Sequence, residues 1–303
     1  MFESWLVLAF ISAFCLGVYD VLKKASVDNN AALLTLWAST TVGSGICASI
    51  LVAQQFHWPF FGVQFSPRPV LSLAQHGLIA MKAVIVSSSW VFAYLSLKNL
   101  PISIVAPIRA SGPVWTLLGA VLIFRESLNP MQWLGFSLTT AAYAWFSLVG
   151  KKEGVIFFRN IWVGSIVLGT IIGAISGLYD KYLIQTCKID PISVQLWFSV
   201  DMFWVQGCIF LIFRKIFPEK TPFRWRWSMP FVAVALLLAD AAYFKALENP
   251  EAQIGLLSAL RRSSLLVSFG FGMALFKDKN SLAKWGPVLC IITGLIILSW
   301  GSH

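Results

Sequence analysis

The segment Gly17–Lys24 recurs 160 residues later as Gly177–Ile184, and this duplication constrains the fold more than any other feature of the chain. The run GVYDVLKK aligns with GLYDKYLI, so that a glycine, a tyrosine and an aspartate repeat in register. A second stretch recurs at an offset of 152 residues and pairs Arg109 with Arg261. The chain therefore reads as two related halves, and internal duplication of an apolar chain is typical of membrane carriers.

The composition places the chain in a membrane. Apolar residues make up 58% of it and charged residues 12%, about half the charged share of a soluble domain. The apolar residues form runs that approach the ~20 residues a helix needs to cross the hydrocarbon core. We therefore predict an all-α, polytopic membrane protein with ten transmembrane helices. The predicted spans are residues 4–24, 31–53, 71–97, 101–124, 130–149, 160–185, 191–214, 228–247, 250–276 and 282–300.

Five spans in each half have a geometric consequence. Residues 1–150 form the first predicted repeat and residues 160–303 the second. Because an odd number of crossings ends on the opposite side of the membrane, the second repeat must be inverted relative to the first. Two inverted halves suit alternating access, since exchanging their conformations changes which side is open.

Ionisable residues inside the predicted spans each cost ~2.5–3.5 kcal/mol on insertion scales, so each calls for an explanation. Four of them are basic. Two acidic residues lie at a comparable depth, and two more aspartates lie nearer helix ends. The basic set is Lys82, Arg109, Arg261 and Arg262; the acidic set is Asp201 and Asp240, with Asp20 and Asp180 nearer the ends.

The repeated arginines are the strongest candidates for a binding site. Arg109 lies about 12 Å into its helix at ~1.5 Å per residue, and Arg261 lies at a broadly similar depth measured from the opposite face. A guanidinium matches a carboxylate or phosphate with two parallel hydrogen bonds. One hypothesis is that Arg109 and Arg261 flank an anionic group of a substrate; the other is that they pair with internal aspartates. Arg262 points about 100° away from Arg261, and we favour Arg261 for the cavity because it alone has a counterpart.

The helix around Arg109 carries Pro107, Gly112 and Pro113, which predict a break. Backbone groups freed by a break are tolerated in a membrane only where they line a cavity or meet other protein groups. A broken helix beside a buried charge thus points to a binding site. The remaining predicted substrate-binding residues are Lys82, Trp90, Tyr94, Tyr19, Tyr179, Ser111 and Ser263.

The intramembrane carboxylates are candidates for proton coupling, because burial in a low dielectric favours the protonated form. These candidates are Asp240, Asp201, Asp20 and Asp180. The alternative is a permanent ion pair with Lys82, Lys245 or an arginine. No catalytic, metal-binding or cofactor-binding residues are predicted: the chain has three histidines, lacks H-E-x-x-H and G-x-S-x-G, and carries no P-loop for ATP.

Three segments carry a resemblance to a known family. They are FRESLNPMQWLG at Phe124–Gly135, FKDKNSLAKWG at Phe276–Gly286 and SALRRSS at Ser258–Ser264. With the five-span halves and the short Asn/Pro turns, they resemble the ten-helix, EamA-type carriers of the drug/metabolite transporter superfamily. The resemblance implies a central cavity lined chiefly by helices one, three, four, six, eight and nine. It leaves the substrate open, because the superfamily moves chemically diverse solutes.

Together these features predict a secondary-active transporter of a small polar metabolite, anionic or amino-acid-like, working by exchange or proton coupling. The alternatives are a flippase for a lipid-linked polar head group and a non-transporting scaffold or receptor; an enzyme is not expected. The expected partners are a small-molecule substrate and the lipid bilayer, without nucleic acid, and a monomer can suffice. The resemblance to bacterial members implies the cytoplasmic (inner) membrane.

Overall fold

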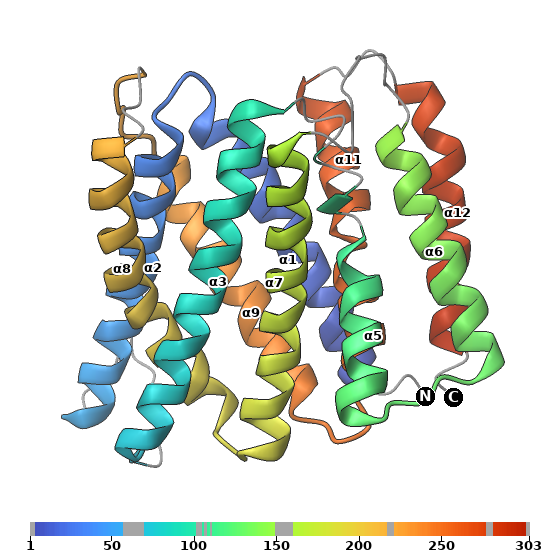
Figure 1. Cartoon of the computed structure of the whole chain (residues 1–303), viewed down its shortest axis with the longest axis horizontal. Helices are drawn as coiled ribbons and strands as arrows, with labels where there is room; N and C mark the ends of the chain where they lie inside the picture. Colours follow the sequence, from blue (N-terminus) through green and yellow to red (C-terminus); the bar gives the residue numbers. More distant parts are fainter. Residues whose placement is uncertain are drawn as a thin grey trace.

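The computed structural model describes residues 4–56, 70–100, 105, 108–109, 111–148, 160–216, 221–276 and 281–300. Within these ranges every regular element is helical, and the helices form an upright bundle (Figure 1). The first half contributes α1 (Ser4–Val27), α2 (Ala32–Gln55), α3 (Leu73–Asn99), α5 (Gly112–Phe124) and α6 (Pro130–Leu148). The second half contributes α7 (Ile161–Lys181) with the π-turn η2 (Tyr182–Thr186), α8 (Pro191–Ile216), α9 (Ser228–Leu247), α10 (Ile254–Arg261), α11 (Ser264–Phe276) and α12 (Ser281–Trp300).

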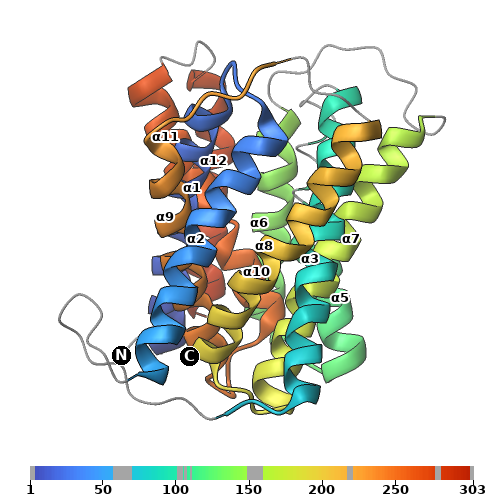
Figure 2. The same ribbon diagram turned by 90° about the vertical axis from the view of Figure 1, so that its left-hand side faces the viewer.

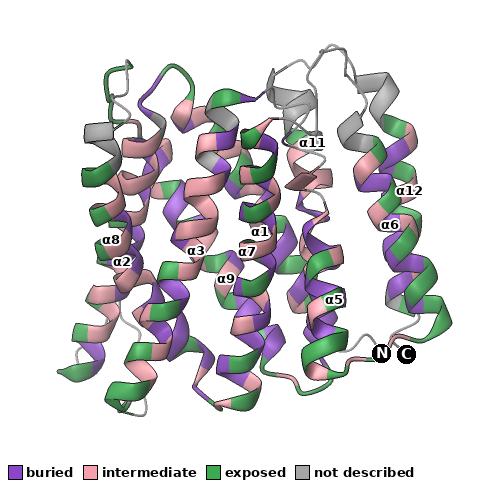
Figure 3. Ribbon diagram, viewed as in Figure 1, coloured by how far each residue is buried: buried purple, intermediate pink, exposed green. Residues whose placement is uncertain are grey.

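Six helices among the described residues are long and apolar enough to cross a bilayer, and two shorter apolar helices lie at Gly112–Phe124 and Trp285–Leu298. Exposed residues are distributed along the helices of the bundle (Figure 3). They include large apolar ones, for example Leu122 at 79% and Trp204 at 66%. Lipid is the environment in which such side chains are stable. The chain is an integral, multi-pass membrane protein. The predicted total of ten spans stays a prediction.

Helices from the two halves pack against each other in a reciprocal pattern. Helix α1 packs on α9 and α3 packs on α7, while α1 contacts α11 and α5 contacts α7. The pairs α2·α8 and α6·α12 join helices that occupy the same place in each half and lie at opposite ends of the bundle (Figures 1 and 2). The core between the halves is built from residues of both, including Leu117, Tyr143, Leu178 and Phe244.

The fourth span of each half is interrupted just after its repeated arginine. Helix α5 begins three residues after Arg109, and α11 begins three residues after Arg261. In the first break Ser111 N–H donates to the Ile108 carbonyl (3.1 Å); in the second, Ser263 N–H donates to the Leu260 carbonyl (3.0 Å). These tight turns are equivalent at the offset of 152 residues. The first break was predicted from its prolines and glycine, whereas the predicted continuous span 250–276 is in fact divided into α10 and α11.

The glycine stripe of α7 brings that helix close to α3. A Cβ added at Gly169 would lie 2.9 Å from Phe92 Cβ, and one at Gly173 would lie 3.1 Å from Ser89 Oγ. Ser89 Oγ also donates a hydrogen bond to the Gly169 carbonyl at 2.7 Å. Small residues allow this approach, as they do at helix interfaces in membranes. The close contact makes α3 and α7 two walls of a polar pocket.

Candidate functional site

A polar pocket lies among α3, α5, α7 and α10, and we call it the arginine pocket. Its volume is about 200 Å³. Two charged side chains line it, Arg109 from the first half and Arg262 from the second. The other lining residues are Ser89, Trp90, Ala93, Gly112, Thr116, Ile166, Gly169, Thr170, Gly173, Ala174 and Ser258.

The breaks in the two fourth spans position both arginines. Arg262 is the residue that caps α10, and its Nη2 donates a hydrogen bond to the Arg109 carbonyl oxygen at 2.7 Å. A Cβ added at Gly112 would lie 3.2 Å from the same Nη2, so the glycine leaves room for the guanidinium. The hydrogen bond satisfies a carbonyl beside the first break, which membrane proteins require of irregular backbone. It also ties the two halves together at the pocket.

Asp20 on α1 is the carboxylate that balances part of this charge. Its carboxyl interacts electrostatically with Arg109, Arg262 and Lys23, and the Lys23 Nζ lies 5.3 Å from the centroid of the Tyr19 ring. Asp20 itself is exposed rather than enclosed in the core. Two guanidiniums and one carboxylate leave the pocket with an excess of positive charge.

A second charged cluster lies in the core and is internally neutral. Lys82 forms a buried ion pair with Asp180, and Tyr243 Oη donates to the other Asp180 oxygen at 3.2 Å. Arg261 Nη2 pairs with Asp240 Oδ1 at 2.8 Å, and its guanidinium carbon lies 4.0 Å from the centroid of the Tyr243 ring. Each cation in this cluster has its own carboxylate, and the shared tyrosine links the two pairs.

A third ion pair fastens the start of α10. Glu126, just after α5, accepts hydrogen bonds from the backbone N–H groups of Ile254 (2.8 Å) and Gly255 (3.3 Å). Its carboxylate also pairs with Lys181 Nζ at 2.5 Å. A carboxylate at a helix N-terminus satisfies orphan donors and complements the helix dipole. The contact joins the halves at one end of the pocket-lining helix.

Comparison with known proteins agrees with the resemblance seen in the sequence. Residues 3–148 match the model of the EamA-like transporter family. A Synechocystis sp. protein described as an uncharacterized transporter is 21% identical over 213 residues. That alignment covers 67% of this chain and 59% of the relative, so the chain spans less than two thirds of the relative's length. The first half of the chain therefore belongs to the EamA-like transporter family, and both likenesses support membership of the chain in the drug/metabolite transporter superfamily.

A solved crystal structure supports the fold of this EamA-like protein over its whole length. The two structures align with a TM-score of 0.71 and cover 99% of each chain, at 12% sequence identity. At that identity the likeness concerns the fold. The arginine pocket lies among spans three, four, six and nine, which are four of the six that the family resemblance had implied for a central cavity.

The structure changes one expectation about this EamA-like protein. We expected Arg261 to share the cavity with Arg109, but Arg262 does so, and Arg261 pairs with Asp240 instead. The reason is that the turn after α10 directs the two neighbouring guanidiniums to different sides. Arg261 faces α9, where Asp240 lies, whereas Arg262 faces the break beside Arg109.

Most of the other predicted substrate-binding residues lie outside the pocket lining. Trp90 lines it, and the side chain of Tyr94 lies outside the described residues. Tyr179 Oη donates to the Leu78 carbonyl at 3.0 Å, and Ser111 Oγ donates to the Ile108 carbonyl at 2.6 Å. Four more residues are held away from the pocket lining, namely Tyr19, Ser263, Lys82 and Arg261.

The carboxylates proposed for proton coupling separate into two groups. Asp180 and Asp240 are engaged in ion pairs, as in the alternative considered for them. Asp20 interacts with the pocket arginines, and Asp201 interacts with His76 across α8 and α3. Within the described ranges no group of histidines, cysteines and carboxylates could hold a metal ion.

Sequence reasoning missed Arg262, Ser258 and Thr116 as pocket residues. Ser258 and Arg262 are four residues apart, a spacing that puts two side chains on one helical face. Ser258 Oγ lies 3.5 Å from Thr116 Oγ1, so hydroxyls from both halves meet there. The i, i+4 spacing of Ser258 and Arg262 was the signal in the sequence, whereas neither residue is marked by the arginine repeat.

Proposed function

We propose that this protein is a secondary-active transporter of a small polar metabolite that carries an anionic group. The observation that carries the proposal is the sharing of one 200 Å³ pocket by Arg109 and Arg262. Guanidiniums from opposite halves can bind a carboxylate or phosphate between them, each with paired hydrogen bonds. Ser89, Thr116 and Ser258 supply neutral hydroxyls for the remaining polar atoms of the substrate.

The charge balance of the bundle supports an anion rather than a cation. Lys82 and Arg261 are neutralised by Asp180 and Asp240 in the core cluster. The arginine pocket has two cations, and Asp20 is a carboxylate that interacts with both of them. A charge that lacks a counterion in the membrane is expensive, and an anionic substrate would offset that cost. A cationic substrate would increase it.

Alternating access is supported by the reciprocal packing of the halves. We propose that residues 1–150 and 160–303 are inverted repeats whose conformations exchange during transport. The hinges would be the equivalent breaks after Arg109 and Arg261, because tight turns between helix segments absorb changes in backbone angle. Each break lies next to the pocket, so substrate binding can act on it directly.

Asp20 is the carboxylate we propose for proton coupling. It lies within electrostatic range of both pocket arginines, so its charge state and anion binding must influence each other. Protonation of Asp20 would strengthen anion binding by removing a competing carboxylate. Transport by exchange alone would leave Asp20 dispensable. We also propose the cytoplasmic (inner) membrane as its location.

Counterflow in proteoliposomes against a panel of anionic, neutral and cationic metabolites tests the proposal. We expect wild-type protein to exchange anionic members of the panel, and Arg109→Ala and Arg262→Ala each to abolish that exchange. Arg224→Ala is the matched control, because Arg224 is exposed and outside the pocket. Anion exchange that persists in both pocket variants would refute the role of the arginines. Exchange of cations alone would refute the proposed substrate class.

A further inference from the structure

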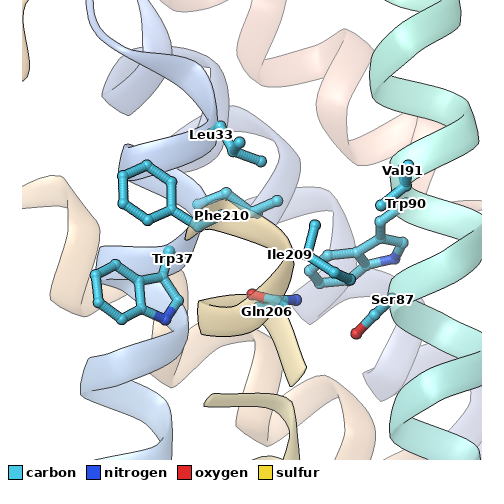
Figure 4. A pocket seen from close by; sticks show the side chains of 9 residues that line it. Leu33, Trp37, Ser87, Trp90, Val91, Gln206, Ile209 and Phe210 are labelled. Carbon is cyan, nitrogen blue, oxygen red and sulfur yellow. The ribbon is translucent and has the colours of Figure 1, made fainter. Parts of the chain in front are cut away.

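A narrow apolar slot lies beside the arginine pocket, between α2, α3 and α8 (Figure 4). Trp37 from α2, Trp90 from α3 and Phe210 from α8 supply its aromatic walls. Its volume is about 30 Å³, compared with about 200 Å³ for the arginine pocket. The slot is only partly enclosed, so it admits a slender chain that extends beyond it and excludes a bulky group.

Gln206 of α8 projects into this slot with its amide unsatisfied (Figure 4). The residue is only 7% exposed, and neither its Nε2 nor its Oε1 has a hydrogen-bond partner. The neighbouring donors are engaged elsewhere: Trp37 Nε1 donates to the Phe203 carbonyl at 3.3 Å, and Ser87 Oγ to Met202 Sδ at 3.4 Å. Buried amides are almost always hydrogen-bonded, so an unsatisfied one that faces a cavity is a candidate contact for a ligand.

The lining defines the chemistry of that ligand. Every residue of the slot is uncharged: besides the aromatic walls and Gln206 it has Ser87 and the aliphatic Leu33, Leu36, Val91 and Ile209. A charged group would lose its hydration there without gaining a counterion. The Gln206 amide offers a donor and an acceptor side by side. The matching ligand is a slender, neutral, mostly apolar group with an adjacent donor and acceptor, as in an amide.

Trp90 lies between this slot and the arginine pocket, because it is part of the lining of both cavities. A molecule that extends past Trp90 would occupy both. Gln206 belongs to the second half and Trp90 to the first, so such a molecule would contact both halves. The arrangement suits a ligand with a charged end and a neutral end.

We propose that the slot binds the neutral end of the transported anion, through hydrogen bonds to Gln206. This inference rests on the proposed function, since the arginine pocket is taken to bind the anionic end. The substrate class becomes an amphipathic anion: a carboxylate or phosphate at one end and a slender amide-bearing or similar group at the other. The aromatic walls would contact its apolar part.

The test uses two probes that differ in one atom. N-hexanoylglycine carries a carboxylate, an amide and a slender chain; its analogue O-hexanoylglycolate has an ester oxygen in place of the amide N–H. That oxygen cannot donate to Gln206 Oε1. Titration calorimetry with purified protein in lipid nanodiscs gives both affinities. Wild-type protein should bind the amide about tenfold more tightly than the ester, as expected for one hydrogen bond.

Gln206→Leu should bind the two probes equally, while retaining the fold because it removes an unsatisfied buried amide. Gln54→Leu is the matched control, since Gln54 is also a buried glutamine on a neighbouring helix but lines neither cavity. It should keep the tenfold preference. The proposal is overturned if Gln206→Leu keeps the preference, if wild-type protein has none, or if wild-type protein binds neither probe.

Arg109→Gln separates this inference from the proposed function. We expect this substitution to weaken the binding of both probes by the same factor and to leave the preference for the amide unchanged. Equal binding of the carboxylates by wild type and Arg109→Gln would refute the anion site, while a preference that depends on Gln206 would still establish the slot. Loss of the amide preference in Arg109→Gln, with the affinity for the ester unchanged, would refute the proposal that the slot is a separate binding site.

Discussion

The guanidinium of Arg262 donates a hydrogen bond to the backbone carbonyl oxygen of Arg109 over 2.7 Å, and this contact crosses between the two halves of the chain. Arg109 lies beside the break of the fourth span, and Arg262 lies in the equivalent break of the ninth. One arginine therefore stabilises the irregular backbone that carries the other. Since both line the same pocket, the proposed anion site and the proposed hinges involve the same residues.

Replacing Arg262 by lysine separates charge from hydrogen-bond geometry. Lysine keeps a positive charge but lacks the planar fork that reaches the Arg109 carbonyl and a substrate together. We expect Arg262→Lys to lose about 1.5–3 kcal/mol of anion binding, the range for a hydrogen bond to a charged group, which is roughly 10- to 100-fold in affinity. Calorimetric titration with an anion that the wild type transports measures it.

Arg261→Lys is the matched comparison for that experiment. Arg261 is the adjacent residue, pairs with Asp240 and does not line the pocket. Its lysine variant can preserve the ion pair, so the affinity for the anion should change by less than threefold. A larger loss in Arg261→Lys than in Arg262→Lys would show that the pocket has been assigned to the wrong arginine.

Breaking the buried ion pair of Lys82 and Asp180 should destabilise the fold more than removing both of its charges. Lys82→Met leaves Asp180 charged in the core, a situation that costs about 3–5 kcal/mol. Adding Asp180→Asn removes the orphaned charge and leaves a side-chain oxygen for Tyr243 Oη. We expect the double variant to unfold at a higher temperature than Lys82→Met, as measured by thermal unfolding in detergent.

The exposed pair of Lys245 and Glu248 provides the control, because its side chains are 62% and 45% accessible. Surface pairs contribute little to stability, so Lys245→Ala should leave the unfolding temperature nearly unchanged. If Lys82→Met is as stable as Lys245→Ala, the core pair does not stabilise the fold more than a surface pair does.

Among the residues that follow α5, Glu126 should be the one whose replacement most weakens the contact between the two halves. Glu126→Ala removes the acceptor for two N–H groups of α10 and leaves Lys181, only 8% exposed, without this carboxylate. We expect a loss of about 3 kcal/mol in unfolding free energy, at the low end for breaking a buried ion pair. Glu126→Gln keeps an acceptor oxygen and should fall between alanine and wild type in thermal unfolding.

Equal stability of Glu126→Ala and Glu126→Gln would contradict this prediction, because the hydrogen bonds to α10 would then contribute nothing to stability. Glu248→Ala, which removes an exposed carboxylate at a helix end, controls for the change in net charge.

Much of the fold was predictable because helix length and apolar runs are local properties. The predicted spans 130–149 and 228–247 correspond to α6 at Pro130–Leu148 and α9 at Ser228–Leu247. The break after Arg109 was also predictable from Pro107, Gly112 and Pro113. The equivalent break at Arg262–Ser263 has no proline and no glycine, so only the repeat itself pointed to it.

The site was harder to predict, since it depends on which way neighbouring side chains turn. Adjacent residues on a regular helix differ by about 100°, but that difference alone does not say which of Arg261 and Arg262 faces the pocket. The choice is made by partners distant in sequence, namely Asp240 for Arg261 and the Arg109 carbonyl for Arg262. Gln206 was overlooked for a related reason: its lack of a partner is visible only once α2, α3 and α8 are packed together.

The contact of α6 with α12 should depend on two glycines that face each other. A Cβ added at Gly135 would lie 2.6 Å from the backbone nitrogen of Leu298 and 2.8 Å from the Gly294 carbonyl oxygen. Backbone atoms cannot move aside as a flexible side chain would, so Gly135→Ala must separate the helices. We expect a cost of about 1–3 kcal/mol, typical of overpacking.

Gly164→Ala is the matched control, because an added Cβ there would meet nothing within 4 Å and alanine favours the helix. Thermal unfolding of the two variants in the same detergent measures the difference. Gly135→Ala should unfold at a lower temperature than wild type and Gly164→Ala at the same or a higher one, and the reverse order would show that α6 and α12 do not pack as closely as described.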